Sequence, residues 1–213
     1  MHKTRDSSSK VWPIPRKGTK YVVVPSRNHQ NGIPLIIIMR DILGFVNTKK
    51  ELKRILHEKA VSVNGKIING EKQSLLLFDT IELKRANKYY KLVYSENRKF
   101  GLEEIGEKET GKKICKLANK KILSGKKMQL NFNDGINIIS NEKINIGDSA
   151  LINLSNKKIE KVLPVKEKAK VLLIMGKHLG SLGEIAKIED KKIFVKSKAM
   201  IFETKNGEII ILE

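Results

Sequence analysis

Residues 33–83, IPLIIIMRDILGFVNTKKELKRILHEKAVSVNGKIINGEKQSLLLFDTIEL, decide the fold. The first segment carries apolar residues at the three- and four-residue spacing of one buried helical face: Leu35, Ile38, Met39, Ile42 and Leu43. Pro34 suits a first helical turn, and Gly44 is a helix stop. Because residues 35–39 alone also fit a strand, the prediction of a helix depends on the continuation of this spacing to Leu43.

A second helix is predicted to begin at Thr48. The Thr48 hydroxyl can cap the first turn while Glu51 reaches back to the chain before it, which is a capping box. The helix buries an apolar stripe and turns five basic side chains outward: Lys49, Lys50, Lys53, Arg54 and His57. Like charges four residues apart weaken an isolated helix, so we expect an anionic group to compensate them.

The second half of this stretch is predicted to be β structure. Residues 61–67 alternate apolar and polar residues around Asn64-Gly65, a pair that strongly favours a hairpin because both turn positions require a positive φ. Residues 75–83 then form one or two buried strands.

Two short helices, this hairpin and a later strand resemble the αL RNA-binding domain. Bacterial small-subunit ribosomal proteins, pseudouridine synthases and tyrosyl-tRNA synthetases share that domain. The resemblance implies that the chain binds structured RNA, and it specifies no reaction. A small α+β domain with a solvated lysine face is the alternative.

The composition indicates a polyanionic partner. The chain has 213 residues, 43 Lys+Arg and 23 Asp+Glu, and a formal net charge of +20, which favours nucleic acid or an acidic membrane surface. All arginines lie in the first 98 residues, and their planar forks can hold phosphate bidentately. We therefore expect the tighter RNA contacts in the N-terminal half.

Several function classes are excluded or disfavoured. The one cysteine, Cys115, excludes an intrachain disulfide framework and any zinc site built on several thiolates, and we expect it to be a buried apolar residue. No apolar run has the length of a membrane span, and the first residues lack the apolar core of a signal peptide. The protein is expected in the cytosol.

Residues 1–32 are predicted to be a basic N-terminal arm. Nothing periodic occurs in residues 1–20, so we expect this segment to become ordered only on a partner. Trp12 can stack on a base or pack onto the neighbouring domain, and packing is favoured. The basic residues taken as RNA contacts here are Lys3, Arg5, Arg16 and Lys17.

The remaining sequence is predicted to be mainly β structure. The αL domain is assigned to residues 33–96, where tyrosines at 89, 90 and 94 cover a sheet or, alternatively, stack on bases. Residues 97–166 form a central all-β domain with a turn at residues 133–135 and a strand pair around Gly147-Asp148.

Residues 167–213 are predicted to form a C-terminal SH3-like barrel. An apolar strand, the glycines at 176, 180 and 183 and a further strand resemble the KOW motif of ribosomal and transcription proteins. The glycines allow the backbone to approach RNA closely. Lys177 and His178 are the candidate contacts of this loop. An ordinary glycine-rich hairpin is the alternative.

No constellation of residues predicts catalysis. The four histidines lack metal-ligand spacing, and no nucleophile elbow, dinucleotide fingerprint or phosphate-binding loop with Gly-Lys-Ser/Thr occurs. Asp134 and Asp148 each adjoin a turn glycine, where aspartate has a backbone role. We therefore expect no active site and no cofactor.

Taken in order, these modules resemble one family over nearly the whole chain. It is the archaeal and eukaryotic family of small-subunit ribosomal proteins numbered four, the S-four-e family. The matching segments are Trp12-Pro13-Ile14, Ile33-Pro34-Leu35, Arg40-Asp41, Val61 to Gly65, Lys116-Leu117, Asn133-Asp134-Gly135, Gly147-Asp148 and Gly176 to Ile185. The chain departs from the family at Thr4 and at Ser181-Leu182, where basic residues are usual.

The resemblance implies a non-enzymatic structural component of the small ribosomal subunit. It implies a cytoplasmic, ribosome-bound protein whose partners are small-subunit ribosomal RNA and neighbouring ribosomal proteins. The fold class is α+β with several domains. Besides the contacts of the arm and the C-terminal loop, the predicted RNA contacts are Arg40, Lys49, Lys50, Lys53, Arg54, Lys66 and Lys72. An RNA-modifying enzyme and a KOW-type transcription or translation factor are the alternatives.

Overall fold

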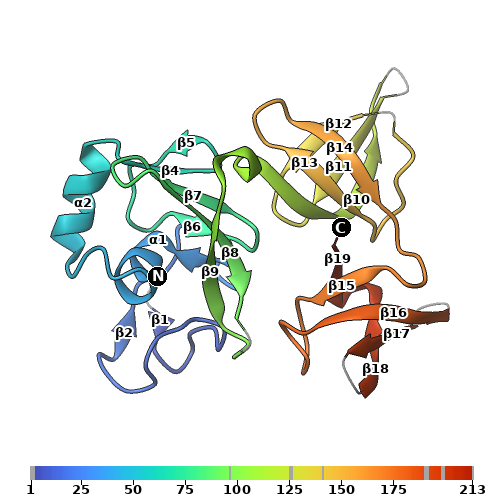
Figure 1. The fold of residues 1–213 in the computed structure, drawn as a ribbon, viewed down its shortest axis with the longest axis horizontal. Helices are drawn as coiled ribbons and strands as arrows, with labels where there is room; N and C mark the ends of the chain where they lie inside the picture. The colour runs from blue at the N-terminus through green and yellow to red at the C-terminus, as the bar shows by residue number, and fades with distance from the viewer. Residues whose placement is uncertain are drawn as a thin grey trace. The chain divides into compact units, whose positions relative to one another are not determined.

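A computed structural model describes residues 3–95, 97–124, 127–140, 142–189, 192–197 and 200–212. The chain divides into two compact units, Met1–Gly111 and Lys112–Glu213. The ribbon contains both helices and strands, with strands predominating (Figure 1). The predicted α+β class is therefore confirmed only in part, because most of the regular structure is β.

The predicted first helix is present but changes its hydrogen-bond period. The α-helical turn α1 (Leu35–Ile37) continues directly into the π-helical segment η1 (Ile38–Ile42). The amide of Leu43 donates to the Ile38 oxygen at 3.0 Å, five residues back, and Gly44 follows with φ +67°. The residues from Leu35 to Met39 are all buried, so this helix is covered on every side and not along one stripe.

Helix α2 (Lys49–His57) begins as predicted. The Glu51 amide donates to Thr48 Oγ1 at 3.3 Å, and the Glu51 carboxylate accepts from the Asn47 amide at 2.8 Å. Leu52 and Leu56 are buried and hold the helix on the core of the first unit. This anchoring leaves the opposite, basic face of α2 exposed.

The main sheet of the first unit has the strand order β5-β4-β7-β8-β9. Its strands are β4 (Val61–Val63), β5 (Lys66–Ile67), β7 (Thr80–Leu83), β8 (Lys88–Tyr94) and β9 (Phe100–Ile105). The predicted hairpin joins β4 and β5, and Asn64 and Gly65 have φ of 52° and 74°. A separate ladder pairs β3 (Ile33–Pro34) with β6 (Ser74–Leu75). Residues 75–83 therefore contribute to two strands, with Phe78 at φ 64° between them.

Buried Asp79 connects the hairpin to the chain before β7. One carboxylate oxygen accepts from the Asn64 side-chain amide at 2.8 Å, and the other accepts from the Leu76 backbone amide at 2.6 Å. The Asn64 side-chain oxygen in turn accepts from the Thr80 amide at 2.9 Å. The turn and the strand beside it are thus held by side-chain hydrogen bonds.

The expectation that residues 1–20 order only on a partner is wrong for the described residues. Strand β1 (Lys3–Thr4) pairs with β2 (Tyr21–Val22), and Trp12 is 2% exposed. The Trp12 indole donates to the Gly32 oxygen at 3.2 Å. The favoured interpretation of Trp12 as a packing residue is confirmed. Burial of this large side chain anchors the segment that carries it.

Strand β9 joins the sheet of the first unit because it pairs with β8. The central β domain was predicted to begin at residue 97. Residues 97–111 fall instead in the first compact unit. Tyr90 is buried in β8, and Tyr94 stacks on Phe100 with ring centroids 5.2 Å apart. These two tyrosines cover the sheet, as favoured.

The first sheet of the second unit has the order β12-β11-β10-β13-β14. Its strands are β10 (Lys112–Ile122), β11 (Met128–Phe132), β12 (Asn137–Ile139), β13 (Ser149–Asn153) and β14 (Lys158–Leu163). The turn at residues 133–135 is confirmed, with Gly135 at φ 82°, and Cys115 is buried as predicted. The strand pair predicted around Gly147-Asp148 is wrong: β13 pairs with β10 and β14, while Ile146 lies in a loop and is 58% exposed.

The second sheet of this unit is a five-stranded antiparallel sheet of order β18-β17-β16-β15-β19. Its strands are β15 (Lys170–Leu173), β16 (Leu182–Glu189), β17 (Lys192–Ser197), β18 (Met200–Lys205) and β19 (Ile209–Ile211). Gly176 and Gly180 have φ of 84° and 81°, so the loop between β15 and β16 uses the backbone freedom of glycine. The sequence analysis did not identify β18.

Candidate nucleic-acid interface

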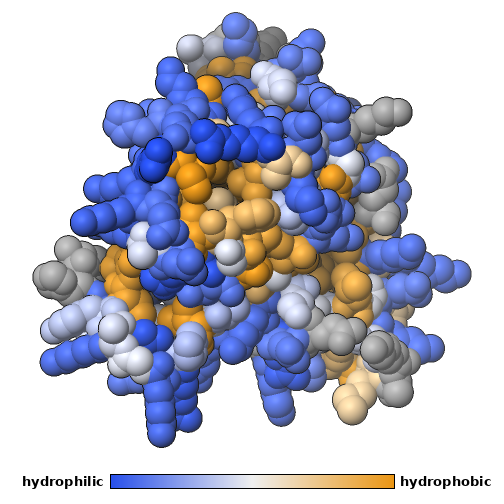
Figure 2. All heavy atoms as spheres, turned by 60° about the vertical axis from the view of Figure 1, so that its left-hand side comes forward, coloured by the Kyte–Doolittle hydropathy of each residue, from blue (hydrophilic) through white to orange (hydrophobic). Residues whose placement is uncertain are grey.

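The exposed face of α2 carries five basic residues on nine residues of helix. The side chains at 49, 50, 53, 54 and 57 are exposed because Leu52 and Leu56 occupy the buried face. Figure 2, turned so that the side bearing α2 comes forward, shows many hydrophilic side chains projecting around a smaller apolar area. The exposure of this face is as expected from the sequence, and its contact with RNA stays a prediction.

Two of these cations are paired with the protein's own carboxylates. Lys49 Nζ lies 2.7 Å from Glu71 Oε1, and Arg54 Nε lies 3.7 Å from Glu58 Oε1. Glu58 also pairs with Arg85 at 2.5 Å. The hydrogen bond from Lys49 lowers the pKa of Glu71 below its ordinary value, so this carboxyl is charged at neutral pH. Part of the anionic compensation expected for α2 is therefore intramolecular.

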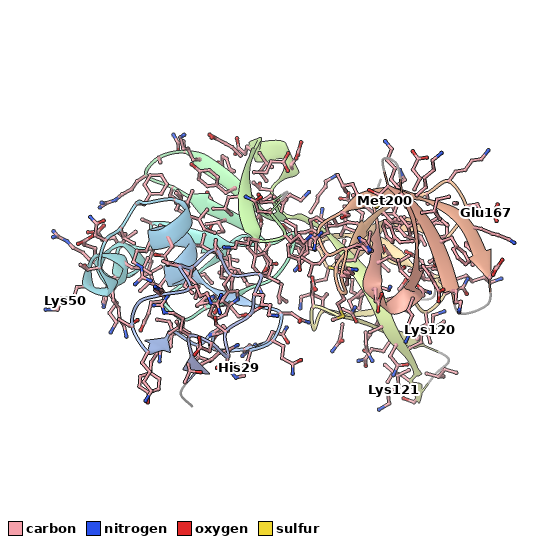
Figure 3. The ribbon with its side chains drawn as sticks, turned by 90° about the horizontal axis from the view of Figure 1, so that it is seen from below. His29, Lys50, Lys120, Lys121, Glu167 and Met200 are labelled. Carbon is pink, nitrogen blue, oxygen red and sulfur yellow. The ribbon has the colours of Figure 1, made fainter. Side chains whose placement is uncertain are left out.

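Lys50 and Lys53 remain available for an external anion. Both are exposed, and neither forms an ion pair with any residue in the described part of the chain. Lys50 projects outward from the end of α2 (Figure 3). These two ammonium groups are the strongest candidates for phosphate contact on this helix, because no carboxylate has to be displaced from them.

Arg40 is engaged by its neighbour. Its Nε and Nη2 donate to the two carboxylate oxygens of Asp41, each at 2.9 Å. This hydrogen bonding raises the pKa of Arg40 above its ordinary value. The fork that would grip a phosphate is filled by a carboxylate, so Arg40 contacts RNA only if Asp41 is displaced.

Lys66 and Lys72 are exposed at and beside the sheet edge. Lys66 lies in β5, the outermost strand of the main sheet, and its register partner is Val63. Lys72 follows in the loop before β6, where its backbone oxygen accepts from the Ser26 amide at 2.7 Å. The position of Lys66 at a sheet edge agrees with the sequence-based expectation.

The arm residues have two different roles. Lys3 Nζ donates to the His29 oxygen at 3.0 Å and lies 5.1 Å from the centre of the Trp12 ring. The Arg5 guanidinium donates to the Thr19 oxygen at 2.8 Å and to the Pro15 oxygen at 2.7 Å. These two cations hold the arm together, whereas the exposed side chains of Arg16 and Lys17 form no ion pair with a described residue.

Lys177 and His178 lie in the second unit, whereas the other predicted contacts lie in the first. Lys177 is exposed in the loop between β15 and β16. The His178 ring stacks on Phe202, with centroids 4.4 Å apart and an interplanar angle of 13°. His178 therefore packs on β18, and Lys177 is the better phosphate candidate.

The described residues contain no group of three or more His, Cys, Asp or Glu side chains that could hold a metal ion. Within the same ranges, no helix has the length and apolar character required to cross a membrane.

Comparison with known proteins identifies the family. The model of the ribosomal family S4e matches residues 86–159. The small ribosomal subunit protein eS4 of Methanocella arvoryzae is 31% identical over 218 residues, covering 100% of this chain and 91% of that protein. The eS4 protein of Archaeoglobus fulgidus is 33% identical over 98% of this chain and 87% of its own length. The chain belongs to the S4e ribosomal family.

A solved structure of the S4e family has the same fold. The crystal structure of the 30S ribosomal protein S4e from Thermoplasma acidophilum matches with a TM-score of 0.73 and 26% identity. The match covers 86% of this chain and 95% of that one. The family resemblance found in the sequence is therefore confirmed, and it extends over nearly the full chain as expected.

Proposed function

We propose that this S4e family member is a structural constituent of the small ribosomal subunit and binds ribosomal RNA through the basic face of α2. The observation that carries the RNA contact is the pair Lys50 and Lys53, two exposed cations that form no ion pair with a described residue. Lys53 acts on Glu71 only through the longer-range attraction that helps to lower the pKa of that carboxyl. The net charge of +20 supplies the long-range attraction to a polyanion.

The arrangement suits recognition of RNA shape. Lysine contacts to phosphate position a protein on RNA without reading its sequence. A folded RNA junction presents phosphates at fixed spacings. The capped helix α2 fixes the spacing of the backbone positions that carry Lys50 and Lys53, so the two lysines can match a pair of phosphates. Specificity then comes from the match of two rigid surfaces.

Four functional segments support this role. We assign residues 1–32 to a basic arm, 33–96 to the αL RNA-binding domain, 97–166 to a central β domain and 167–213 to a KOW-type SH3-like barrel. Of the third segment, residues 97–111 belong with the αL domain, because their strand β9 completes its sheet. Lys66, Lys72, Arg16 and Lys17 are proposed as further phosphate contacts of the first two segments. Lys177 is the proposed contact of the last.

The proposed surroundings are those of a ribosomal protein. Its partners are small-subunit ribosomal RNA and neighbouring ribosomal proteins, and its location is the ribosome in the cytoplasm. The S4e family consists of ribosomal proteins, so the chain is not an enzyme. An RNA-modifying activity has no support from the comparisons.

The salt dependence of RNA binding tests the proposal. Affinity for a folded fragment of small-subunit ribosomal RNA is measured at several salt concentrations for the parent and for Lys50→Ala plus Lys53→Ala. Loss of two phosphate contacts is expected to reduce the slope of log K against log salt by about 2. Lys157→Ala plus Lys158→Ala removes the same charge from two exposed residues at the start of β14 in the second unit and should change the slope less. Equal slopes for the two variants would place the RNA surface elsewhere.

A further inference from the structure

The N-terminal arm borders a cavity of which the proposed function uses only Arg16. It has a volume of about 580 Å³ and is lined by the arm together with Lys99, which precedes β9. Cavities that bind small organic molecules have volumes in this range. All of its lining residues belong to the first unit.

The lining combines positive charge with an apolar surface. Arg5, Lys10, Arg16 and Lys99 contribute cations, against the single carboxylate of Asp6. The accessible apolar part of the wall is Ile14 and Pro15, because Trp12, which also borders the cavity, is 2% exposed. A ligand with a phosphate group attached to a flat ring system can contact the cations with its phosphate and the apolar side chains with a ring face. A bare anion contacts only the cations.

The cavity wall is fixed before any ligand arrives. Three nitrogen atoms of the Arg5 side chain donate to the segment from Pro15 to Thr19, so the guanidinium is locked in place. An arginine fork has five N–H groups, and three are used in these bonds. A guanidinium that is already oriented loses little conformational entropy when it binds phosphate.

A hydrogen bond also ties the two sides of the cavity together. The Phe100 amide donates to the Val11 oxygen at 2.8 Å, which joins the start of β9 to the arm. Lys99 stands at the end of the tight turn before it, where the Ser95 amide donates to the Lys99 oxygen at 2.8 Å. Lys99 is therefore held beside the arm although it lies far from it in sequence.

We propose that this cavity binds one unpaired nucleotide of a ribosomal RNA strand, with the phosphate on the cationic side chains and the base against the apolar wall. The proposal rests on the proposed function and adds a site for single-stranded RNA to the shape-reading surface of α2. A continuous RNA strand is the expected ligand because the same unit carries both basic features.

The test uses the full chain and the 5′-phosphorylated ribotetranucleotide of uridine. Binding is measured by titration calorimetry and by the emission of Trp12, the only tryptophan of the chain. Arg16→Ala plus Lys99→Ala alters two exposed side chains and is expected to weaken binding about tenfold, as for the loss of two charge-assisted contacts.

Two double variants serve as controls. Lys120→Ala plus Lys121→Ala removes equal charge from the far end of β10, where both side chains project away from the sheet (Figure 3). It should change the tetranucleotide affinity less than about twofold, because neither side chain lines the cavity. Lys50→Ala plus Lys53→Ala should likewise leave the tetranucleotide affinity unchanged while weakening the binding of folded ribosomal RNA.

The results that would contradict these proposals distinguish the nucleotide site from the RNA-binding face of α2. If the parent and Arg16→Ala plus Lys99→Ala bind the tetranucleotide equally, the cavity is not a nucleotide site. The same conclusion follows if inorganic phosphate or hexaglutamate competes at the concentration at which the tetranucleotide itself binds. If the α2 variant binds folded ribosomal RNA as the parent does, the proposed function of that face fails, whatever the tetranucleotide result.

Discussion

Lys116 Nζ, in strand β10, donates a hydrogen bond to the backbone oxygen of Ile209, in strand β19, at 2.7 Å. The same ammonium also donates to the backbone oxygen of Asn206. A further bond runs from the Ile211 amide to the hydroxyl of Ser149, the register partner of Lys116 in β13, at 3.0 Å. The two sheets of the second unit are therefore joined by buried polar contacts as well as by apolar packing.

Replacing Lys116 should destabilise the second unit. The side chain is almost fully buried, and Lys116→Ala leaves two backbone oxygens without their donor and an unfilled space. The expected loss in the free energy of unfolding is about 2–4 kcal/mol. Urea denaturation measures it. Lys121→Ala, on the exposed part of the same strand, should cost less than about 0.5 kcal/mol. A similar loss for both would show that the buried contacts contribute nothing specific.

The contribution of Lys116 to the free energy of unfolding should depend on pH. Burial lowers its pKa from 10.5 to about 8, while Asp148 opposes this shift. Between pH 8 and 10.5 the unfolded chain binds more protons than the folded one, so stability rises with pH in this window. Below pH 8 the cost of burying the charge is fully present. The stability difference between the parent and Lys116→Ala should therefore grow from pH 7.5 to pH 9.5, and a constant difference would contradict the shift.

Tyr94 should produce the opposite trend at higher pH. Burial raises the pKa of its phenol to about 12. Between pH 10 and 12 the folded chain keeps a proton that the unfolded chain releases, so stability falls as pH rises. Tyr94→Phe retains the ring that stacks on Phe100 and removes the titrating group. Denaturation of the first unit should show a smaller fall in this variant than in the parent, and parallel curves would refute the assignment.

Asn64 combines two effects that substitution can separate. Its backbone has a φ of 52°, and its side chain bonds to Asp79 and to the Thr80 amide. Asn64→Ala removes the hydrogen bonds and keeps a strained β-carbon, with an expected loss of about 2–3 kcal/mol. Asn64→Gly relieves the backbone strain and should recover about 1 kcal/mol of this loss. Thermal unfolding with both variants measures the two parts, and equal losses would mean that strain is negligible.

Gly183 has no room for a side chain. A β-carbon added there would lie 2.6 Å from Val195 Cγ1 and 2.7 Å from the Lys196 backbone oxygen. Since a backbone atom cannot move aside cheaply, Gly183→Ala should cost about 1–3 kcal/mol. Gly207→Ala is the matched control, because a β-carbon there meets nothing within 4 Å. Denaturation midpoints compare the two, and equal midpoints would contradict the close approach of β16 and β17.

Local features of the sequence were predicted well. The cap at Thr48, the Asn64-Gly65 hairpin, the packing of Trp12 and the buried Cys115 are all confirmed. Each of these depends on residue type and short-range spacing. The π-helical continuation of α1 was not predicted, because the burial of its first turn on all sides overrides the pattern of a single apolar stripe.

Long-range pairings could not be predicted from one sequence. The ion pair of Lys49 with Glu71 joins residues 22 positions apart (71 − 49), and no spacing rule connects them. The pairing of β9 with β8 and the ordering of the arm by Trp12 depend in the same way on tertiary contacts. For the candidate interface, the sequence identified the basic helix but not which of its cations are already neutralised.

Before any RNA binds, the carboxylates of Glu71 and Glu58 already pair with two cations of α2. At Lys49 and Arg54, an RNA phosphate exchanges with an anion that is already in place, and the net gain is only the difference between the two contacts. RNA whose phosphates fit poorly gains little binding free energy from this exchange, whereas a well-placed phosphate gains more. In the proposed complex, Lys50 and Lys53 bind phosphates that match their spacing, while Lys49 and Arg54 add affinity only where a phosphate fits better than the carboxylate that it displaces.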